Sequence, residues 1–239
     1  MIFLNSNSSN DDLNTDSARA EIFKRIRTLQ SRPIERQPGE EAKARQYIED
    51  HRRGPLPKPV DDVQALFIQR SKAMLCTVDE VADIKDVPGA CAKYLDDNQL
   101  LGQPAVWPSL EQLDWSALGR DPRFGAPSGD DLIGVSAVAY AVAETGTLVF
   151  ASRADEPAST HLLPETHIAI VRADQVVHTM EEAFARLRED GRAMARALNF
   201  VSGPSRTADI EQTIVLGAHG PYRVHLIMVK TREKGPKDE

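Results

Sequence analysis

Residues 132–171 read LIGVSAVAYAVAETGTLVFASRADEPASTHLLPETHIAIV, and this stretch decides the fold. Three apolar runs stand in it, at 132–136, 147–150 and 167–171, and each is continuous rather than alternating. Continuous apolar runs of this length are typical of strands buried on both faces, as in a parallel sheet. The alanine-rich run 137–142 fits one helical turn or an extended chain equally well.

Helices and strands alternate outward from this stretch. A capped helix is predicted after Asp61–Asp62, and a capping-box pattern at Thr179 predicts the start of another. Further strands are expected at 73–78, 104–108, 198–201 and 222–229, and further helices at 88–97, 159–163, 180–189 and 209–216. The sequence therefore predicts an α/β domain over residues 60–230, with a mainly parallel sheet covered by helices on both faces.

The N-terminal part has a different composition. Residues 1–16 are mostly Asn, Ser, Asp and Thr, which predicts a disordered lead-in, and residues 17–59 predict a helical, proline-containing basic arm. Two interpretations of the arm stay open: a solvated surface whose arginines pair with the body, or an arm that grips a polyanion. Residues 231–239 are expected to form a charged tail.

Composition excludes several functional classes. A formal charge of -7 argues against a general nucleic-acid binder. Two cysteines, Cys76 and Cys91, cannot supply a disulfide scaffold or a site with four thiolates, which fits a reducing cytoplasm. No apolar run approaches the roughly 18 to 20 residues of a membrane span, and the N-terminus lacks a signal-peptide pattern. We expect a soluble, cytoplasmic protein with no membrane span and no metal site.

Two loops are candidates for chemistry. In the first, Glu144 precedes Thr145, Gly146 and Thr147 at the turn into a buried strand. Its carboxylate can act as a nucleophile or general base, or can hold the turn by accepting backbone hydrogen bonds, and the spacing favours neither. Gly146 would let a ligand approach the backbone closely.

The second loop, residues 202–211, follows a strand and precedes a predicted helix, which is where α/β proteins bind anions. Its hydroxyls and guanidinium could hold a carboxylate or phosphate, and the alternative is a structural turn with an ion-paired arginine. The candidate ligand-binding residues here are Gly203, Ser205, Arg206, Thr207 and Asp209. The loop lacks the Gly-Lys-Ser/Thr of a P-loop.

The six histidines show no metal-ligand spacing. His167 and His225 fall in predicted strands, where a buried imidazole is the simpler interpretation than a catalytic base. His219, flanked by glycines in 217–221, is expected to face a pocket. No Ser-His-Asp arrangement can be nominated from the sequence.

Several motifs occur together: Gly134–Ser136, Ala143–Leu148, Leu163–Pro164 with His167–Ile168, Ser202–Glu211 and Leu216–Pro221. In this combination the chain resembles the LUD domain of the lactate utilization protein C family, over roughly residues 60–230. The resemblance implies a fold similar to sugar-phosphate isomerases, CoA transferases and formyltetrahydrofolate cyclo-ligases. It also implies a role in oxidising L-lactate to pyruvate with two partner proteins, at least one of which carries iron-sulfur clusters.

In the similar transferases a glutamate near a glycine turn accepts the acyl group, and Glu144 resembles it in setting. The leading hypothesis is a subunit of a lactate-oxidising system that binds a small anion between the two loops, with no cofactor of its own. Two alternatives are a stand-alone enzyme acting on a CoA thioester or sugar phosphate, and a scaffold whose arm docks an acidic partner. The hypothesis places Glu144 and the loop 205–209 on the same edge of the sheet.

Overall fold

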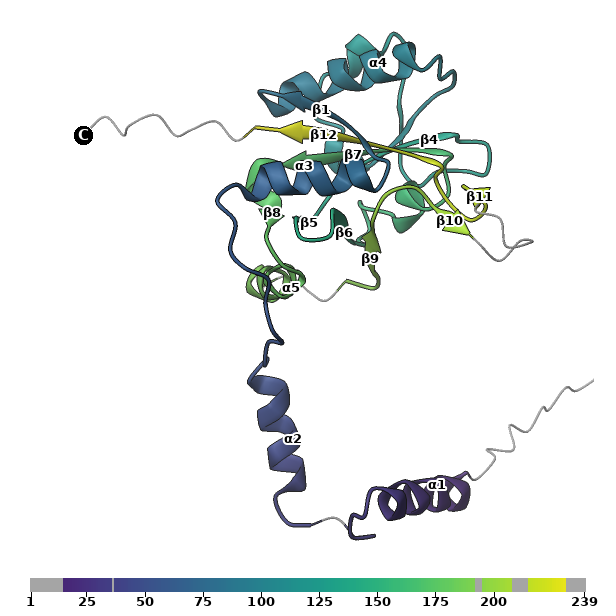
Figure 1. Ribbon diagram of the computed structural model, residues 1–239. Coiled ribbons are helices and arrows are strands. Elements are labelled where there is room, and N and C mark those ends of the chain that lie inside the picture. The colour runs from purple at the N-terminus through teal and green to yellow at the C-terminus, as the bar shows by residue number, and fades with distance from the viewer. Residues whose placement is uncertain (1–14, 36, 192–194, 208–214, 231–239) are drawn as a thin grey trace, which may run out of the picture. The chain divides into compact units, whose positions relative to one another are not determined.

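The computed structural model describes residues 15–35, 37–191, 195–207 and 215–230 (Figure 1). The chain divides into two compact units, residues 1–54 and 55–239, and each is described by itself. The predicted lead-in and the charged tail fall almost entirely outside the described residues.

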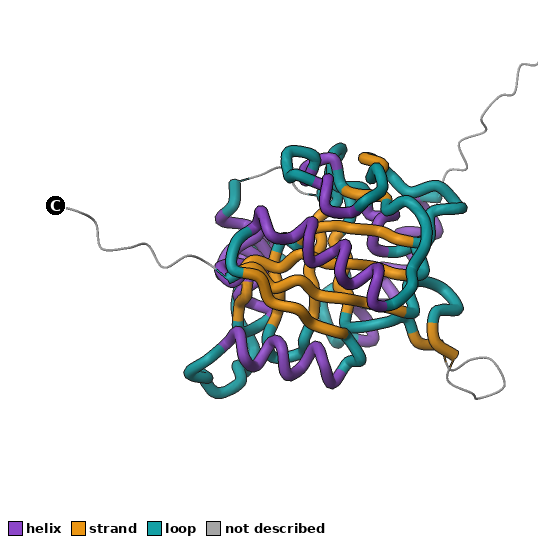
Figure 2. The backbone as a smooth tube through the Cα atoms, turned by 90° about the horizontal axis from the view of Figure 1, so that it is seen from above, coloured by secondary structure: helices purple, strands orange, loops and turns teal. Residues whose placement is uncertain are grey.

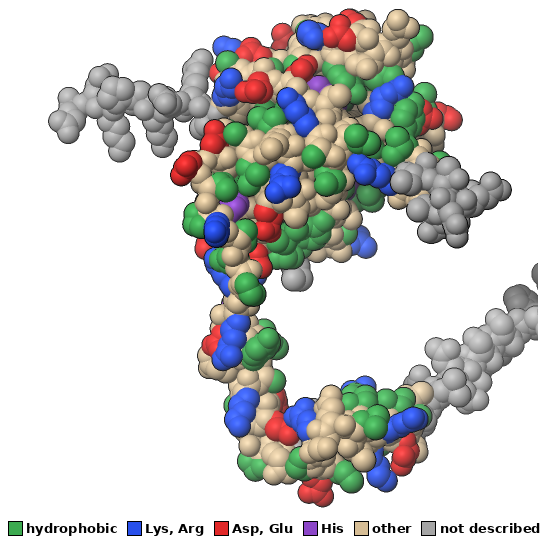
Figure 3. Space-filling model, viewed as in Figure 1, with side chains coloured by type: hydrophobic (Ala, Val, Ile, Leu, Met, Phe, Trp, Pro, Cys, Tyr) green, Lys and Arg blue, Asp and Glu red, His purple; other side chains and the backbone are tan. Residues whose placement is uncertain are grey.

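The N-terminal unit holds two amphipathic helices, α1 (Asp16–Leu29) and α2 (Glu40–Glu49). The Glu40 carboxylate connects them, because it forms ion pairs with Arg27 and Arg32, both at 3.1 Å. The Arg27 hydrogen bond is the largest cause of the lowered pKa of Glu40. No residue of either helix is buried, and the hydrophobic side chains Phe23 and Leu29 are exposed. Hydrophobic and charged side chains are interspersed on the visible surface of this unit (Figure 3).

The second unit is built on a six-stranded sheet whose pairs are all parallel. Its register aligns Thr77, His225, Ile168 and Val135 in one row, so all the strands begin at one edge and end at the other. In spatial order the strands are β1 (Thr77–Val81), β12 (Arg223–Val229), β7 (Thr166–Arg172), β4 (Ile133–Ala137), β2 (Ala105–Val106) and β3 (Arg123–Phe124).

A second sheet of four strands was not predicted from the sequence. The chain changes sheets just after β4, where the Val138 N–H donates to Ile170 of the large sheet and the Ala139 N–H donates to Val149 of the small one. The run 137–142 is therefore extended. In spatial order the small sheet holds β8 (Val176–Val177), β5 (Tyr140–Val142), β6 (Thr147–Ala151) and β9 (Leu198–Val201).

Helix α4 (Val87–Asp97) covers one face of the large sheet, while α3 (Val63–Ala73) and the small sheet cover the other (Figures 1 and 2). The predicted α/β fold with a mainly parallel, two-sided sheet is confirmed. Short 3₁₀ helices complete the unit: η1 (Ile84–Asp86), η2 (Pro108–Leu110), η3 (Trp115–Leu118), η4 (Ala158–His161) and η5 (Ala173–Gln175).

Both predicted helix caps are present. The Asp62 carboxylate accepts a hydrogen bond from the Ala65 N–H at 2.8 Å, at the start of α3. The Thr179 hydroxyl accepts from the Glu182 N–H at 3.2 Å, at the start of α5 (Met180–Glu189). Side-chain acceptors at these positions satisfy N–H groups that have no partner inside the helix.

Several predicted elements differ from the structure in bounds or type. The strand expected at 104–108 is limited to Ala105–Val106, and the helix expected at 159–163 is the 3₁₀ helix η4. Ala73 still belongs to α3, and the strand expected at 73–78 begins only at Thr77. The helix predicted at 209–216 does not extend to residue 216. Val215–Leu216 instead form a strand, β11, that pairs with β10 (Arg206–Thr207). The remainder of that predicted helix, residues 209–214, lies outside the described residues.

Candidate functional site

The loops 143–147 and 202–207 are neighbours, because β6 pairs with β9 and places Leu148 opposite Val201. A chain of hydroxyls joins them: Thr145 Oγ1 lies 2.7 Å from Thr147 Oγ1, which lies 2.7 Å from Ser202 Oγ. Thr147 is buried, whereas Thr145 and Ser202 are exposed. This hydroxyl chain fixes the relative position of two segments that are distant in the sequence.

The glycines of both loops accommodate the end of helix α3. A Cβ on Gly203 would lie 2.2 Å from the Met74 carbonyl oxygen, and one on Gly146 would lie 2.8 Å from the backbone of Arg70. Both glycines also have positive φ, 78° and 66°. Only glycine combines this conformation with so close a backbone approach. The group that lies against the two glycines is the end of α3, and not a ligand as the sequence predicted for Gly146.

Glu144 is bound to the start of helix α5. Its Oε1 accepts a hydrogen bond from the Met180 N–H at 3.0 Å, and its own N–H donates to the His178 carbonyl at 3.0 Å. A carboxylate at this position is stabilised by the N–H groups and dipole of the helix N-terminus. The structure thus gives Glu144 a definite structural task, that of holding the β5–β6 turn against α5.

The loop 202–207 and the turn 217–221 are connected through backbone groups. The Ser205 N–H donates to Pro221 at 2.8 Å, and the Gly217 N–H donates to Ser205 at 2.9 Å. Arg206 is exposed, and its Nη2 donates to the Met74 carbonyl at 3.1 Å.

Of the remaining site candidates, Thr207 pairs with Val215 in the β10–β11 ribbon. His219 is exposed in the turn between β11 and β12. Asp209 lies outside the described residues. The structure thus groups Thr145, Thr147 and Ser202 around the hydroxyl chain, and Ser205 with the turn of His219, while the Glu144 carboxylate is directed to α5.

The loop 202–207 and the turn 217–221 lie at the amino end of the large sheet. The N–H groups of Tyr222 and Arg223 donate to the carbonyl of Glu165, the residue just before β7. Parallel sheets ordinarily bind ligands at the carboxyl ends of their strands. The loop 202–207 does follow the carboxyl end of β9, but that strand belongs to the small sheet.

Among the cavities lined by described residues, two that share Arg172 open at the carboxyl end of the large sheet. The larger, of about 380 Å³, lies beyond β2, β4 and β7, and its charged lining was not predicted because its residues are scattered along the sequence. It is lined by Trp107, residues 137–140, Arg153, Glu156, Arg172, Asp174, Gln175, Arg186 and Asp190.

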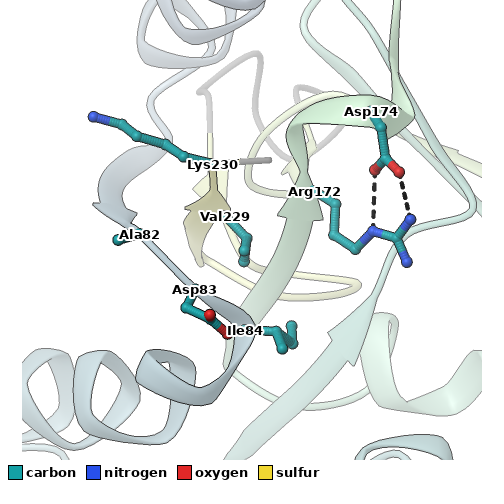
Figure 4. A pocket seen from close by; sticks show the side chains of 7 residues that line it. All are labelled: Ala82, Asp83, Ile84, Arg172, Asp174, Val229 and Lys230. Atoms are coloured by element: carbon teal, nitrogen blue, oxygen red, sulfur yellow. Dashed lines mark hydrogen bonds and ion pairs between the residues drawn. The ribbon is translucent and has the colours of Figure 1, made fainter. Parts of the chain in front are cut away.

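The smaller cavity, of about 350 Å³, lies beyond β1, β12 and β7 (Figure 4). Arg172 lines it too, but its guanidinium turns away from Asp83 and binds Asp174, with Nε 3.0 Å from Oδ1. This pairing raises the pKa of Arg172 and lowers that of Asp174. Lys230 pairs with Glu80 at 3.0 Å, so the cations of this cavity are directed to protein carboxylates.

The buried histidines belong to the core. His167 Nε2 lies 2.8 Å from the Ser136 hydroxyl, and His161 stacks on Phe150 at 4.1 Å between ring centroids. Burial lowers the pKa of His161 to about 4 and that of His167 to about 3, so both rings are neutral at pH 7. Within the described ranges, no group of three or more His, Cys, Asp or Glu residues could hold a metal ion.

The LUD domain family model matches residues 130–229, which run from the start of β4 to the end of β12. The matched segment contains both loops, the turn of His219 and the two central strands of the large sheet. Fold and site together define an α/β protein of the LUD class. Of the helices in the described part of the chain, none is long and apolar enough to cross a membrane.

Several curated relatives are named lactate utilization protein C. The one from Deinococcus radiodurans is 36% identical over 151 residues, which are 60% of this chain and 69% of the relative. Those from Geobacillus thermodenitrificans and Bacillus subtilis are 38% and 37% identical, over 49% and 52% of this chain and 49% and 57% of their own length. The matched region therefore spans about half the length of most of these relatives.

A solved structure, a DUF162 family protein from Deinococcus radiodurans, superposes with a TM-score of 0.53 at 28% sequence identity. The match covers 72% of this chain and 99% of that protein. With this shared fold and the coverage of the Deinococcus relative, the chain belongs to the lactate utilization protein C family.

Proposed function

We propose that the chain is a cytoplasmic component of an iron-sulfur-dependent system that oxidises L-lactate to pyruvate. The observation that carries the proposal is the similarity to proteins named lactate utilization protein C. The LUD domain match, at residues 130–229, includes both loops of the candidate site. The name belongs to the relatives, and its extension to this chain is the proposal.

The two cysteines support a division of labour between this chain and iron-sulfur partners. Cys91 is fully buried and Cys76 is 6% exposed, and burial raises their pKa values to about 12 and about 11. Cluster ligands are thiolates, four to a cluster in the common types. Two buried, protonated thiols cannot meet that need, so the electron-carrying clusters would belong to the partners.

The proposed ligand of this chain is a small carboxylate bound by the loop 202–207 and the turn 217–221, here called the amino-end loops. Arg206 provides an exposed guanidinium, held in place by its bond to the Met74 carbonyl. The neighbouring Ser205, Thr207 and His219 add hydrogen-bonding side chains on the same connected loops. A planar guanidinium with nearby hydroxyls is well suited to a carboxylate.

A deletion strain tests the proposal. Loss of the chain should prevent growth on L-lactate but not on pyruvate, and the wild-type gene should restore it. Arg206→Gln should restore growth poorly, whereas Arg188→Gln, an exposed arginine of helix α5, serves as the matched control. Normal lactate growth of the deletion strain would refute the proposed function.

A further inference from the structure

The larger cavity at the carboxyl end of the large sheet holds three arginines that no part of the proposed function uses. Arg153 follows β6, Arg172 ends β7, and Arg186 projects from α5. Three separate elements thus bring guanidinium groups to one cavity of about 380 Å³. A volume of this size falls in the range of small-molecule binding sites, about 300–1,000 Å³.

Arg153 and Arg186 are paired only loosely. Arg153 Nε lies 3.8 Å from Glu156, and Arg186 Nη2 lies 3.6 Å from Glu182, and both distances exceed a hydrogen bond. Among the described residues, neither guanidinium makes a hydrogen bond. Their N–H donors are therefore able to bind the oxygens of a ligand without breaking a hydrogen bond first.

The remaining charged residues of the cavity are held in place. Arg172 is engaged in two hydrogen bonds with Asp174, and Asp190 accepts a hydrogen bond from the Tyr140 hydroxyl at 2.9 Å. Glu156 is fixed through its backbone, which forms a two-way bridge with that of Arg153. The same bridge holds Arg153, whose side chain is only 26% exposed.

The uncharged walls are partly apolar. Trp107 is 2% exposed, and its indole N–H is already satisfied by the Pro157 carbonyl at 3.1 Å. The segment 137–139 adds small side chains, and the N–H groups of Val138 and Ala139 are engaged in the two sheets. A ligand would therefore meet small apolar side chains as well as the arginines.

We propose that this cavity binds a small organic anion with two or more carboxylate or phosphate groups, held by the guanidinium groups of Arg153 and Arg186. The position agrees with the general rule that parallel sheets bind ligands beyond the carboxyl ends of their strands. The site lies at the opposite edge of the sheet from the amino-end loops and is independent of the lactate role.

Calorimetry on the full-length chain tests this site, with citrate and inorganic pyrophosphate as the two probes. At least one probe should bind, and the double variant Arg153→Gln/Arg186→Gln should weaken its affinity by about tenfold or more. Arg188→Gln is the control, since it removes the same charge from helix α5 outside the cavity and should leave the affinity unchanged.

Binding of citrate would indicate a polycarboxylate ligand, and binding of pyrophosphate would indicate a phosphate ligand. The proposal is overturned if neither probe binds at millimolar concentration, or if the double variant binds as tightly as the control. The single variant Arg153→Lys keeps the charge, so a retained melting temperature with weakened binding would show that the planar guanidinium is required. The growth of the deletion strain on lactate tests the proposed function, and it neither supports nor overturns the binding site in this cavity.

Discussion

The Thr147 hydroxyl lies 2.7 Å from the Ser202 hydroxyl, and this contact joins two loops that carry most of the candidate site. Thr147 is 3% exposed, so its hydroxyl depends on these partners rather than on water. The two loops are therefore one structural unit at the end of the β6–β9 pair, and a change in either is expected to affect both.

Replacement of Thr147 by valine should loosen this unit. The change keeps the shape of the side chain but removes the hydroxyl, and a lost buried hydrogen bond costs about 1 kcal/mol of unfolding free energy. For a chain of this size, that lowers the melting temperature by about 2–4 °C. Thr145→Val, at an exposed position, should have a smaller effect, and an equal effect would contradict the role given to burial.

Gly203→Ala should be strongly destabilising. A Cβ there would lie 2.2 Å from the Met74 oxygen, and the positive φ of 78° adds strain. Together these effects should cost about 2–4 kcal/mol. Gly129→Ala is the matched control, since its Cβ would meet nothing within 4 Å. If the two variants melt at the same temperature in thermal unfolding, α3 does not pack against this loop as described.

Glu144→Gln separates a structural role from a catalytic one. Glutamine keeps an oxygen that can accept from the Met180 N–H, whereas Glu144→Ala leaves that group unpaired and should cost about 0.5–2 kcal/mol. If Glu144 only holds the turn, the glutamine variant keeps both stability and lactate-linked activity. A stable glutamine variant without activity would instead indicate that the charged carboxylate takes part in chemistry.

Stability should fall as the solution becomes acidic. Burial lowers the folded-state pKa values of His161 and His225 to about 4 and that of His167 to about 3. Between pH 6.5 and these values only the unfolded chain binds protons on these rings. Acid therefore favours unfolding, by about 2 kcal/mol for each ring at pH 5 relative to pH 7.

Denaturant titrations at several pH values measure this slope. His161→Leu should flatten it, even if the variant is less stable at neutral pH. A wild-type stability that is constant from pH 7 to pH 5 would contradict the buried, neutral state of these rings.

The central part of the fold could be predicted because its strands are continuous apolar runs. In β7 six successive residues, Thr166–Val171, are buried, and such a run needs a sheet covered on both faces. The small sheet could not be predicted in the same way. Its strand β5 has three residues and continues almost directly from β4, so only the change of hydrogen-bonding partners at 138–139 separates the two sheets.

The candidate site was predictable in its residue types but not in its contacts. Positive φ and a close approach are sound reasons for Gly146 and Gly203, but the group that approaches is α3, which is distant in the sequence. The helix bound by Glu144 begins 36 residues later. The carboxyl-end cavity collects arginines from three elements, and no local motif marks them.

The most direct test of the proposed function is lactate-dependent dye reduction by the purified iron-sulfur partners, measured with and without this chain. Reduction should require the chain, should fall in Arg206→Gln, and should be retained in Arg188→Gln. An unchanged rate of dye reduction in the complete absence of the chain would contradict its proposed role in lactate oxidation.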